Sequence, residues 1–286
     1  MASENGHPAS PPEQGKQVFV VALGASAGGI APLTEFFSLM PADGDMAYVV
    51  ILHLSPEHES NLSAVLQSRT RMPVTQVTAP VAVEANHIYV IPPSKNLLME
   101  DGLIRPIEPE PPRISHAIDL CFRSLADAYG KNSIAILLSG TGADGTLGLG
   151  RVKEQGGFVI AQDPEEAEYA DMPRNAINAA VVDLVIRVAE MPAKVLALRD
   201  AAERLQIAPE PEEVLVTDDE SALREVLTVL RLRTGNDFTQ YKRPTLLRRI
   251  ARRMQVHELR DIGAYVEFIH SHPDEVPILL RDLLIT

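Results

Sequence analysis

The sequence predicts an α/β protein with a doubly wound, mostly parallel sheet flanked by helices, followed by a small all-α domain. From residue 17 onward, short β-branched runs alternate with longer helical patterns, which is typical of βαβ units. After Val188 this strand pattern stops, and from Ser221 onward every segment has helical periodicity. These observations predict a sheet domain and a separate helical domain.

The expected elements follow the hydrophobic pattern in chain order. We expect strands at 17–23, 47–52, 133–138, 158–161 and 181–186. Helices are expected at 29–40, 61–69, 117–129 and 147–155. The runs 83–93 and 96–107 are interpreted as an antiparallel insertion, because Asp101 and Gly102 form a turn signal between alternating segments.

Four segments are expected along the chain: a disordered tail at 1–16, a sheet domain at 17–188, a helix with an acidic linker at 189–220, and helices at 221–286. The helix expected at 190–206 carries an apolar stripe, which predicts that it docks on the sheet domain. It either covers the strand ends and limits access, or completes the fold elsewhere. The stripe consists of Val195, Leu198 and Leu205.

Composition narrows the class of protein. The 286 residues have a net charge of −13 and 45% hydrophobic residues, which argues against a nucleic-acid binder and is ample for a core. A single cysteine, Cys121, excludes a disulfide framework and favours the cytoplasm. No apolar run approaches the roughly 20 residues of a membrane helix, so no membrane insertion is expected.

Three strand ends carry chemistry-bearing residues, at the place where open α/β sheets bind their ligands. The sequences there are LGASAGG, LHLSPEH and SGTGADGT. They predict a triad of Ser26 as nucleophile, His53 as general base and Asp144 as the acid that orients the base. Backbone N–H groups of Ala27 and Thr141 are the expected oxyanion donors.

Other interpretations of these loops remain open. The glycines around Ser26 loosely imitate a phosphate-binding turn, although the G-x-G-x-x-G spacing is not met. Asp144 could simply cap the helix that follows it. The pair His53 and His58, with the glutamates near them, offers metal-ligand atoms, but no third ligand cluster appears and no metal is expected.

Five motifs in this order and spacing resemble the catalytic domain of the chemotaxis receptor methylesterases, known as CheB. They are LGASAGG, ILHLSPEH, HIYVIPP, LSGTGADGTLG and ADMPRNAI. The resemblance implies that Ser26, His53 and Asp144 are nucleophile, base and orienting acid. It also implies hydrolysis of glutamate 5-methyl esters on chemoreceptors, often with deamidation of receptor glutamines, and no cofactor. The chain departs from the family's commonest pattern at two positions, because Ala27 stands where that pattern has Thr and Thr141 stands where it has Met. In the family a receiver domain commonly precedes the catalytic domain, and we expect no such domain before residue 17 here.

The second module, with its segment LREVLTVLRLRTGNDFTQYKRPTLLRRIARRM, resembles the N-terminal helical subdomain of the receptor methyltransferases, known as CheR. The whole then resembles a methylesterase-methyltransferase fusion. S-adenosylmethionine would belong to a methyltransferase domain that these residues do not include, so we expect no methyl transfer.

A basic helix is expected within this module. Residues 224–260 contain ten Lys or Arg against three Asp or Glu, a local excess inside an acidic chain. Leu246, Ile250 and Met254 form an apolar stripe on the helix. The other side, either a solvated charged face or a site for Glu-rich receptor helices, consists of Arg248, Arg249, Arg252 and Arg253.

The leading hypothesis is therefore a protein-glutamate methylesterase. The first alternative is a non-catalytic module that binds a receptor or partner with the same fold. A second alternative is a nucleotide-binding regulatory domain that uses the turn from Gly24 to Gly29.

Overall fold

The computed structural model describes residues 18–52, 61–109, 116–207, 217–238 and 240–284. Side chains are described for these residues except at 203–207 and 217–219. Within this part of the chain, no helix is long and apolar enough to cross a membrane.

The central feature of the described chain is a seven-stranded sheet with the order β10-β9-β8-β1-β2-β5-β3, in which every neighbouring pair is parallel. A three-stranded antiparallel sheet, β4-β7-β6, lies beside it. The strands of the large sheet are β1 Phe19–Ala25, β2 Met46–Leu52, β3 Val74–Gln76, β5 His87–Val90, β8 Ser133–Leu137, β9 Phe158–Gln162 and β10 Leu184–Ile186. Those of the small sheet are β4 Val81–Ala82, β6 Asn96–Glu100 and β7 Leu103–Ile107.

Both faces of the large sheet are covered, as expected for a doubly wound fold. Side chains alternate along β1, so Val21 and Leu23 pack into one hydrophobic cluster while Val20 and Ala22 pack into the other. The first cluster is covered by α1 Ile30–Leu39, α2 Leu62–Gln67 and α6 Met191–Ile207. The second is covered by α3 Ala117–Tyr129, α4 Thr146–Glu154, α5 Asp171–Asn178 and the small sheet.

The predicted fold class is confirmed, but the segment 83–93 differs from its prediction. The hairpin β6–β7 forms around Asp101 and Gly102, whose φ angles of 52° and 75° make the tight turn. The expectation that 83–93 belongs to the antiparallel insertion is wrong, because β5 lies inside the large sheet and pairs in parallel with β2 and β3. Ile88 and Val90 pack into the first hydrophobic cluster and Tyr89 packs into the second, which fits a strand buried on both faces.

The helix α6 docks on the sheet domain as its apolar stripe predicts. Val195 and Leu198 have no exposed surface and pack in the same cluster as α1, while Leu205 lies outside the described side chains. Arg199 donates a hydrogen bond to the carbonyl of Gly44, two residues before β2. The helix therefore lies toward the starts of the strands, so the interpretation of α6 as a cover over the strand ends near Ser26 is wrong.

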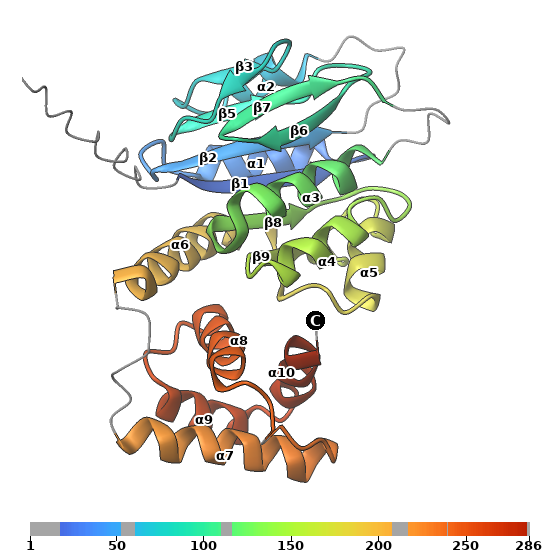
Figure 1. Cartoon of the computed structure of the whole chain (residues 1–286). Helices are drawn as coiled ribbons and strands as arrows, with labels where there is room; N and C mark the ends of the chain where they lie inside the picture. Colours follow the sequence, from blue (N-terminus) through green and yellow to red (C-terminus); the bar gives the residue numbers. More distant parts are fainter. Residues whose placement is uncertain (1–17, 53–60, 110–115, 208–216, 239, 285–286) are drawn as a thin grey trace, which may run out of the picture.

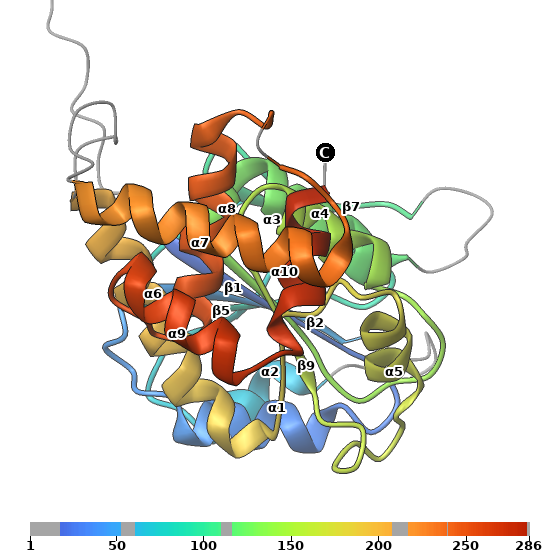
Figure 2. The ribbon, with the colours of Figure 1, turned by 90° about the horizontal axis from the view of Figure 1, so that it is seen from below.

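The C-terminal helices form a module with a hydrophobic cluster of its own, in which Leu246 and Ile250 are buried. Figure 1 shows this module beside the β9 side of the sheet, with α8 and α10 facing the sheet domain and α7 and α9 beyond them. Figure 2, seen from the side of the module, shows the same layering. The helices are α7 Thr217–Thr234, α8 Arg243–Val256, α9 Ile262–Ser271 and α10 Glu275–Leu284.

Candidate active site

The crevice of a doubly wound sheet opens where two neighbouring strands send their connections in opposite directions. In this chain those strands are β1 and β8, which pair in parallel. The chain leaves β1 toward α1 on one face of the sheet and leaves β8 toward α4 on the other. Ser26 directly follows β1, and the loop 139–145 follows β8, so both lie at this point.

The loop that carries Ser26 is a tight turn between β1 and α1. The amide of Ser26 donates to the carbonyl of Ser139 at 2.9 Å, and the amide of Gly29 donates to the carbonyl of Ser26 at 2.9 Å. Gly28 has a φ of +71°, and a Cβ there would lie 2.8 Å from the Ser139 hydroxyl, so the turn requires glycine at this position. Ser26 itself is half-buried at the start of this turn.

Ser139 joins three loops around Ser26, a role that the sequence did not reveal. Its hydroxyl donates to the Ala27 carbonyl at 2.9 Å and accepts from the Tyr169 amide at 3.0 Å. Its own amide donates to the Gln162 side-chain oxygen at 2.9 Å, and Ser139 is only 1% exposed. Ser139 lies inside the motif LSGTGADGTLG. A serine among glycines is also common in ordinary turns, so the sequence did not indicate that it would join these loops.

Gly140 and Met172 complete the wall beside Ser26 and were likewise missed from the sequence. The amide of Gly140 donates to the Tyr169 carbonyl at 2.9 Å, and the amide of Met172 donates to the Gly140 carbonyl at 3.0 Å. A Cβ on Gly140 would lie 2.2 Å from the sulfur of Met172 and 2.9 Å from the Cβ of Ser26. The loop after β8 can approach Ser26 this closely only because residue 140 has no side chain.

The two amides expected to hold an oxyanion lie in these same loops. Among the described residues, the N–H groups of Ala27 and Thr141 donate no backbone hydrogen bond. Ala27 is half-buried beside Ser26, and Thr141 is exposed directly after Gly140. Both lie in the loops around Ser26, and their role as oxyanion donors remains a prediction.

Asp144 lies in the same loop as Thr141, and its carboxylate is turned toward α3. Its two oxygens accept hydrogen bonds from the amides of Ile118 at 3.2 Å and Asp119 at 3.0 Å. It therefore caps α3 rather than the helix that follows it. Burial raises the pKa of Asp144, and the two amide hydrogen bonds counteract this rise. Each oxygen can accept a second hydrogen bond, so capping does not exclude a histidine partner.

His53 lies outside the described residues, as do His58 and its neighbouring glutamates, so the structure does not place the expected general base. The strand before it is described. Leu52, the last residue of β2, pairs in register with Ala25, which directly precedes Ser26. The chain therefore leaves β2 next to the point where it leaves β1.

A group of possible metal ligands includes Asp144. One ligand atom each from His116, Asp119 and Asp144 lies within 4.8 Å of the others. The Asp119 carboxylate already accepts from the Gly148 amide at 2.7 Å, and Asp144 caps α3. The N-terminus of α3 also carries a positive partial charge, which disfavours a cation. We therefore assign both carboxylates to hydrogen bonding with helix amides.

The structure corrects the expectation for the basic helix. Arg249, Arg252 and Arg253 are only 5%, 4% and 1% exposed, so they are not available to an acidic receptor segment in this arrangement. Arg252 donates to the carbonyl of Gly157, and its guanidinium pairs with Asp183 and with Asp282 at 2.9 Å. The carboxylates that neutralise these arginines are Asp183 of the sheet domain and Glu275 and Asp282 of α10. Only Arg248 of the four is exposed.

The remaining arginine contacts complete a buried joint between the two modules. Arg253 pairs with Glu275 at 2.7 Å and with Asp183 at 3.6 Å. Lys153 of the sheet domain pairs with Asp282 at 2.6 Å and with Asp183 at 3.2 Å. Burial alone raises the pKa of Asp183, but the charges of Arg252 and Lys153 outweigh it and hold that pKa well below its ordinary value.

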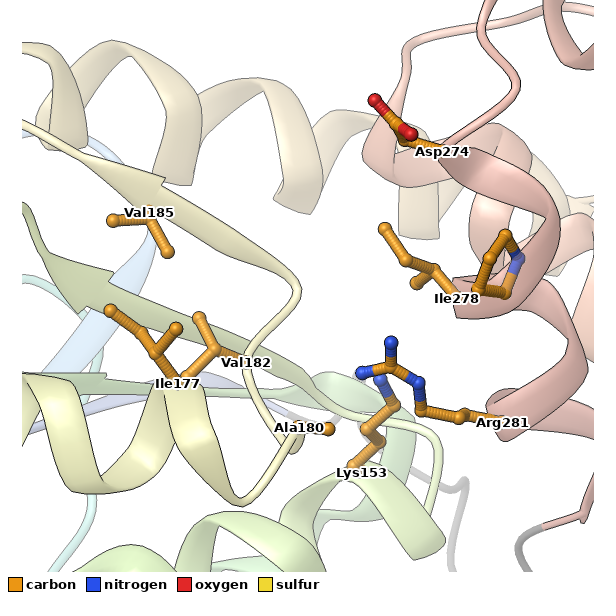
Figure 3. Close-up of a pocket in the computed structure, with 9 residues that line it drawn as sticks. Lys153, Ile177, Ala180, Val182, Val185, Asp274, Ile278 and Arg281 are labelled. Carbon is orange, nitrogen blue, oxygen red and sulfur yellow. The ribbon is translucent and has the colours of Figure 1, made fainter.

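A pocket of about 340 Å³ lies beside this joint. Figure 3 shows apolar side chains from both modules in its walls, with Lys153 and Arg281 together on one side and Asp274 at the rim. Its sheet-domain lining comes from the end of α4, the end of α5 and β10. The pocket includes neither Ser26 nor the loop after β8, so the hydrolytic chemistry is not placed there.

Comparisons with known proteins identify relatives of both modules. Residues 21–195 match the family model of the CheB methylesterase, and residues 221–284 match that of the CheR methyltransferase all-alpha domain. The crystal structure of the Thermotoga maritima CheB methylesterase catalytic domain is 26% identical and superposes with a TM-score of 0.59, covering 64% of this chain and 100% of that one.

Two curated relatives illustrate the range of protein lengths. A protein-glutamate methylesterase/protein-glutamine glutaminase of Hydrogenovibrio crunogenus is 33% identical over 63% of this chain and 49% of its own length. An uncharacterized 104.1 kDa protein of Rhodobacter capsulatus is 33% identical over 78% of this chain and 25% of its own length. The chain thus spans about half or less of these relatives. Since the methylesterase family model alone matches more than half of its residues, the chain belongs to the CheB methylesterase family.

Proposed function

We propose that the chain is a protein-glutamate methylesterase that hydrolyses glutamate 5-methyl esters on chemoreceptor-type proteins. The observation that carries this proposal is the position of Ser26, in a glycine turn at the switch point of the sheet, against the loop after β8. The relatives named as methylesterase and glutaminase support the same reaction class. A glutamine side chain is the amide counterpart of this ester, and its hydrolysis would also give glutamate.

In the proposed reaction, the Ser26 hydroxyl oxygen attacks the ester carbonyl carbon while His53 takes its proton. The amides of Ala27 and Thr141 donate to the carbonyl oxygen as it becomes an oxyanion. The intermediate collapses, His53 returns the proton, and methanol leaves. Water, activated by His53, then hydrolyses the acyl-enzyme, which leaves a glutamate side chain on the substrate protein and restores Ser26. With a glutamine as substrate, ammonia would leave in place of methanol.

Asp144 would orient His53 and stabilise its protonated form. Its carboxylate is held in place by the α3 amides, which gives it the fixed position that this role needs. The register of Leu52 with Ala25 supports His53 as the base, because it brings the two chain exits together. The proposed acylation of Ser26 and the hydrolysis of the acyl-enzyme use no cofactor and no metal ion.

The test is methanol release from a methylated receptor by the full chain and by single variants. Ser26→Ala, His53→Ala and Asp144→Asn are each expected to lower the rate by about 1,000-fold or more, without additivity, because the groups act as a unit. Ser38→Ala is the matched control, since Ser38 is an exposed serine of α1 whose hydroxyl donates to the Glu35 carbonyl of the same helix.

If Ser26→Ala released methanol at the rate of the unaltered chain, the triad would be wrong. If the unaltered chain bound the methylated receptor but released no methanol, the non-catalytic binding module would replace the esterase as the best account of this fold.

A further inference from the structure

The segment 168–172 runs along the loop that carries Ser26, and it is held there at two points. Tyr169 is bonded through its amide to the Ser139 hydroxyl and through its carbonyl to the Gly140 amide. Met172 packs against the same Gly140 beside Ser26. The backbone and the Cβ atoms of this segment are therefore held in a fixed position relative to Ser26.

Glu168 places a negative charge against this loop. Its carboxylate oxygen Oε2 and its Cβ each lie 2.9 Å from the point that a Cβ on Gly28 would occupy. Gly28 is two residues from Ser26, in the same turn. Glu168 is exposed, and among the described residues it makes no ion pair. Within the described ranges, no cation therefore neutralises its charge.

Two other acidic side chains of this loop have partners of their own. Glu166 accepts hydrogen bonds from the Gln162 side chain at 3.2 Å and the Val188 amide at 2.9 Å. Glu165 pairs with Arg174 at 3.7 Å. Glu168 is the carboxylate of this loop that the structure places against Gly28, in the turn that carries Ser26.

Tyr169 adds an aromatic side chain to the same rim. It is 41% exposed although its backbone is anchored to Ser139 and Gly140. An exposed ring on a fixed backbone offers apolar contact area to a bound segment, and it can also contact the stem of a lysine or arginine. The rim is therefore acidic and aromatic, which complements a basic side chain rather than an acidic one.

We propose that Glu168 is a specificity-determining residue, which selects target glutamate esters flanked by a basic residue and disfavours targets flanked by acidic residues. This rests on the proposed esterase function. A lysine or arginine one helical turn from the target would approach Glu168 while the ester reaches Ser26. A glutamate in that place would meet a like charge, which weakens binding at low ionic strength.

The experiment uses three helical peptides with one glutamate methyl ester each, identical except for Lys, Gln or Glu four residues from the target. We measure kcat/KM for methanol release by the full chain. The unaltered chain is expected to prefer the Lys peptide to the Glu peptide roughly three- to ten-fold, from two surface-type charge interactions. The preference should shrink in about 0.5 M salt, because screening weakens exposed charges.

Two variants with the same charge change separate the contribution of Glu168 from that of the net charge. Glu168→Gln is expected to abolish most of the preference between the Lys and Glu peptides. Glu165→Gln is expected to keep it, because that carboxylate faces Arg174.

The inference is overturned if the unaltered chain shows no preference or favours the Glu peptide, or if Glu168→Gln keeps the preference. Absence of methanol from all three peptides, including the neutral one, would instead overturn the proposed function. Turnover of the neutral peptide thus distinguishes a failure of the specificity residue from a failure of the esterase.

Discussion

At the scale of single residues, Gly140 is the described glycine at which an added Cβ would meet the shortest contact, 2.2 Å from the sulfur of Met172. A methyl group there would collide with the sulfur of Met172 and with Ser26. We expect Gly140→Ala to displace Ser26 relative to the loop after β8 and to lower kcat/KM about 10- to 100-fold, because small misplacements of a nucleophile are costly. Gly150→Ala is the control, because the nearest atom to its added methyl group is 3.7 Å away.

Both glycine variants are compared by methanol release and by urea unfolding. Gly150 lies within α4, so alanine is expected to leave activity unchanged and to stabilise the fold by about 0.5–1 kcal/mol. Equal activity of Gly140→Ala and the unaltered chain would show that the close approach of the two loops does not position Ser26.

The residue scale also shows where sequence reasoning ends. The places of Ser26 and Asp144 in strand-end loops could be predicted, because such loops are where an α/β sheet binds its ligands, and their catalytic roles remain predictions. Ser139 and Met172 could not, because their contributions are a hydrogen bond to Ala27 and a contact at Gly140, and both depend on how three loops meet. Arg252 was misjudged for the same reason, since its partners Asp183 and Asp282 are distant in the sequence.

At the scale of elements, the hydrophobic pattern predicted most helices and strands of the sheet domain to within a few residues. Three short elements, β3, β4 and α5, were not predicted, and β5 was grouped with the neighbouring hairpin because the two apolar runs are adjacent. Periodicity shows that a run is a strand, but it does not show which strand lies beside it. The pairing of β5 with β2 and β3 places Ile88 and Val90 in one cluster and Tyr89 in the other.

The helix α6 gives a test at this scale. Leu198 has no exposed surface and packs in the cluster that α1 also covers. Leu198→Ala is expected to lower the free energy of unfolding by about 2–5 kcal/mol, because it removes buried methyl groups and leaves a cavity. Since α6 lies away from Ser26, kcat/KM of the folded fraction should not change.

Leu232→Ala in α7 is the matched control, because Leu232 is 81% exposed and its truncation is expected to change stability by less than about 0.5 kcal/mol. Urea unfolding measures both variants, and methanol release at a temperature where each remains folded measures activity. A rise in kcat/KM for Leu198→Ala would restore the idea that α6 limits access to the site.

At the scale of the whole molecule, the buried joint determines how the two modules are held. Three cations from both modules surround Asp183, with Asp282 as the second carboxylate among them. Apolar contacts contribute as well, since Val256 of α8 packs into the sheet-domain cluster. A fixed joint of this kind turns the basic side of α8 inward, and an acidic partner could reach those arginines only if the modules separated.

The joint is tested by removing one charge without changing its shape. Asp183→Asn leaves Arg252, Arg253 and Lys153 with fewer buried anions, so we expect the free energy of unfolding to fall by about 3–5 kcal/mol at pH 7. Asp127→Asn removes a carboxylate that pairs with Arg151 at the surface, where the two side chains are 57% and 41% exposed, and should cost less than about 1 kcal/mol. If Asp183→Asn and Asp127→Asn lowered the free energy of unfolding equally in urea, burial would not be what strengthens the ion pairs of Asp183.

The pH dependence of the same measurement follows from the lowered pKa of Asp183. A carboxyl group with a folded pKa below its unfolded value of 3.8 contributes stability that is fully present above that value. The contribution is lost as the pH falls through the folded pKa, because the unfolded chain then binds the proton first. Glu275 behaves alike: burial raises its pKa, but hydrogen bonds from His257 and Arg253 hold it at about 2. Between pH 7 and pH 2 the unaltered chain should therefore lose more stability than Asp183→Asn, and parallel curves would contradict the assignment of the acid loss to this joint.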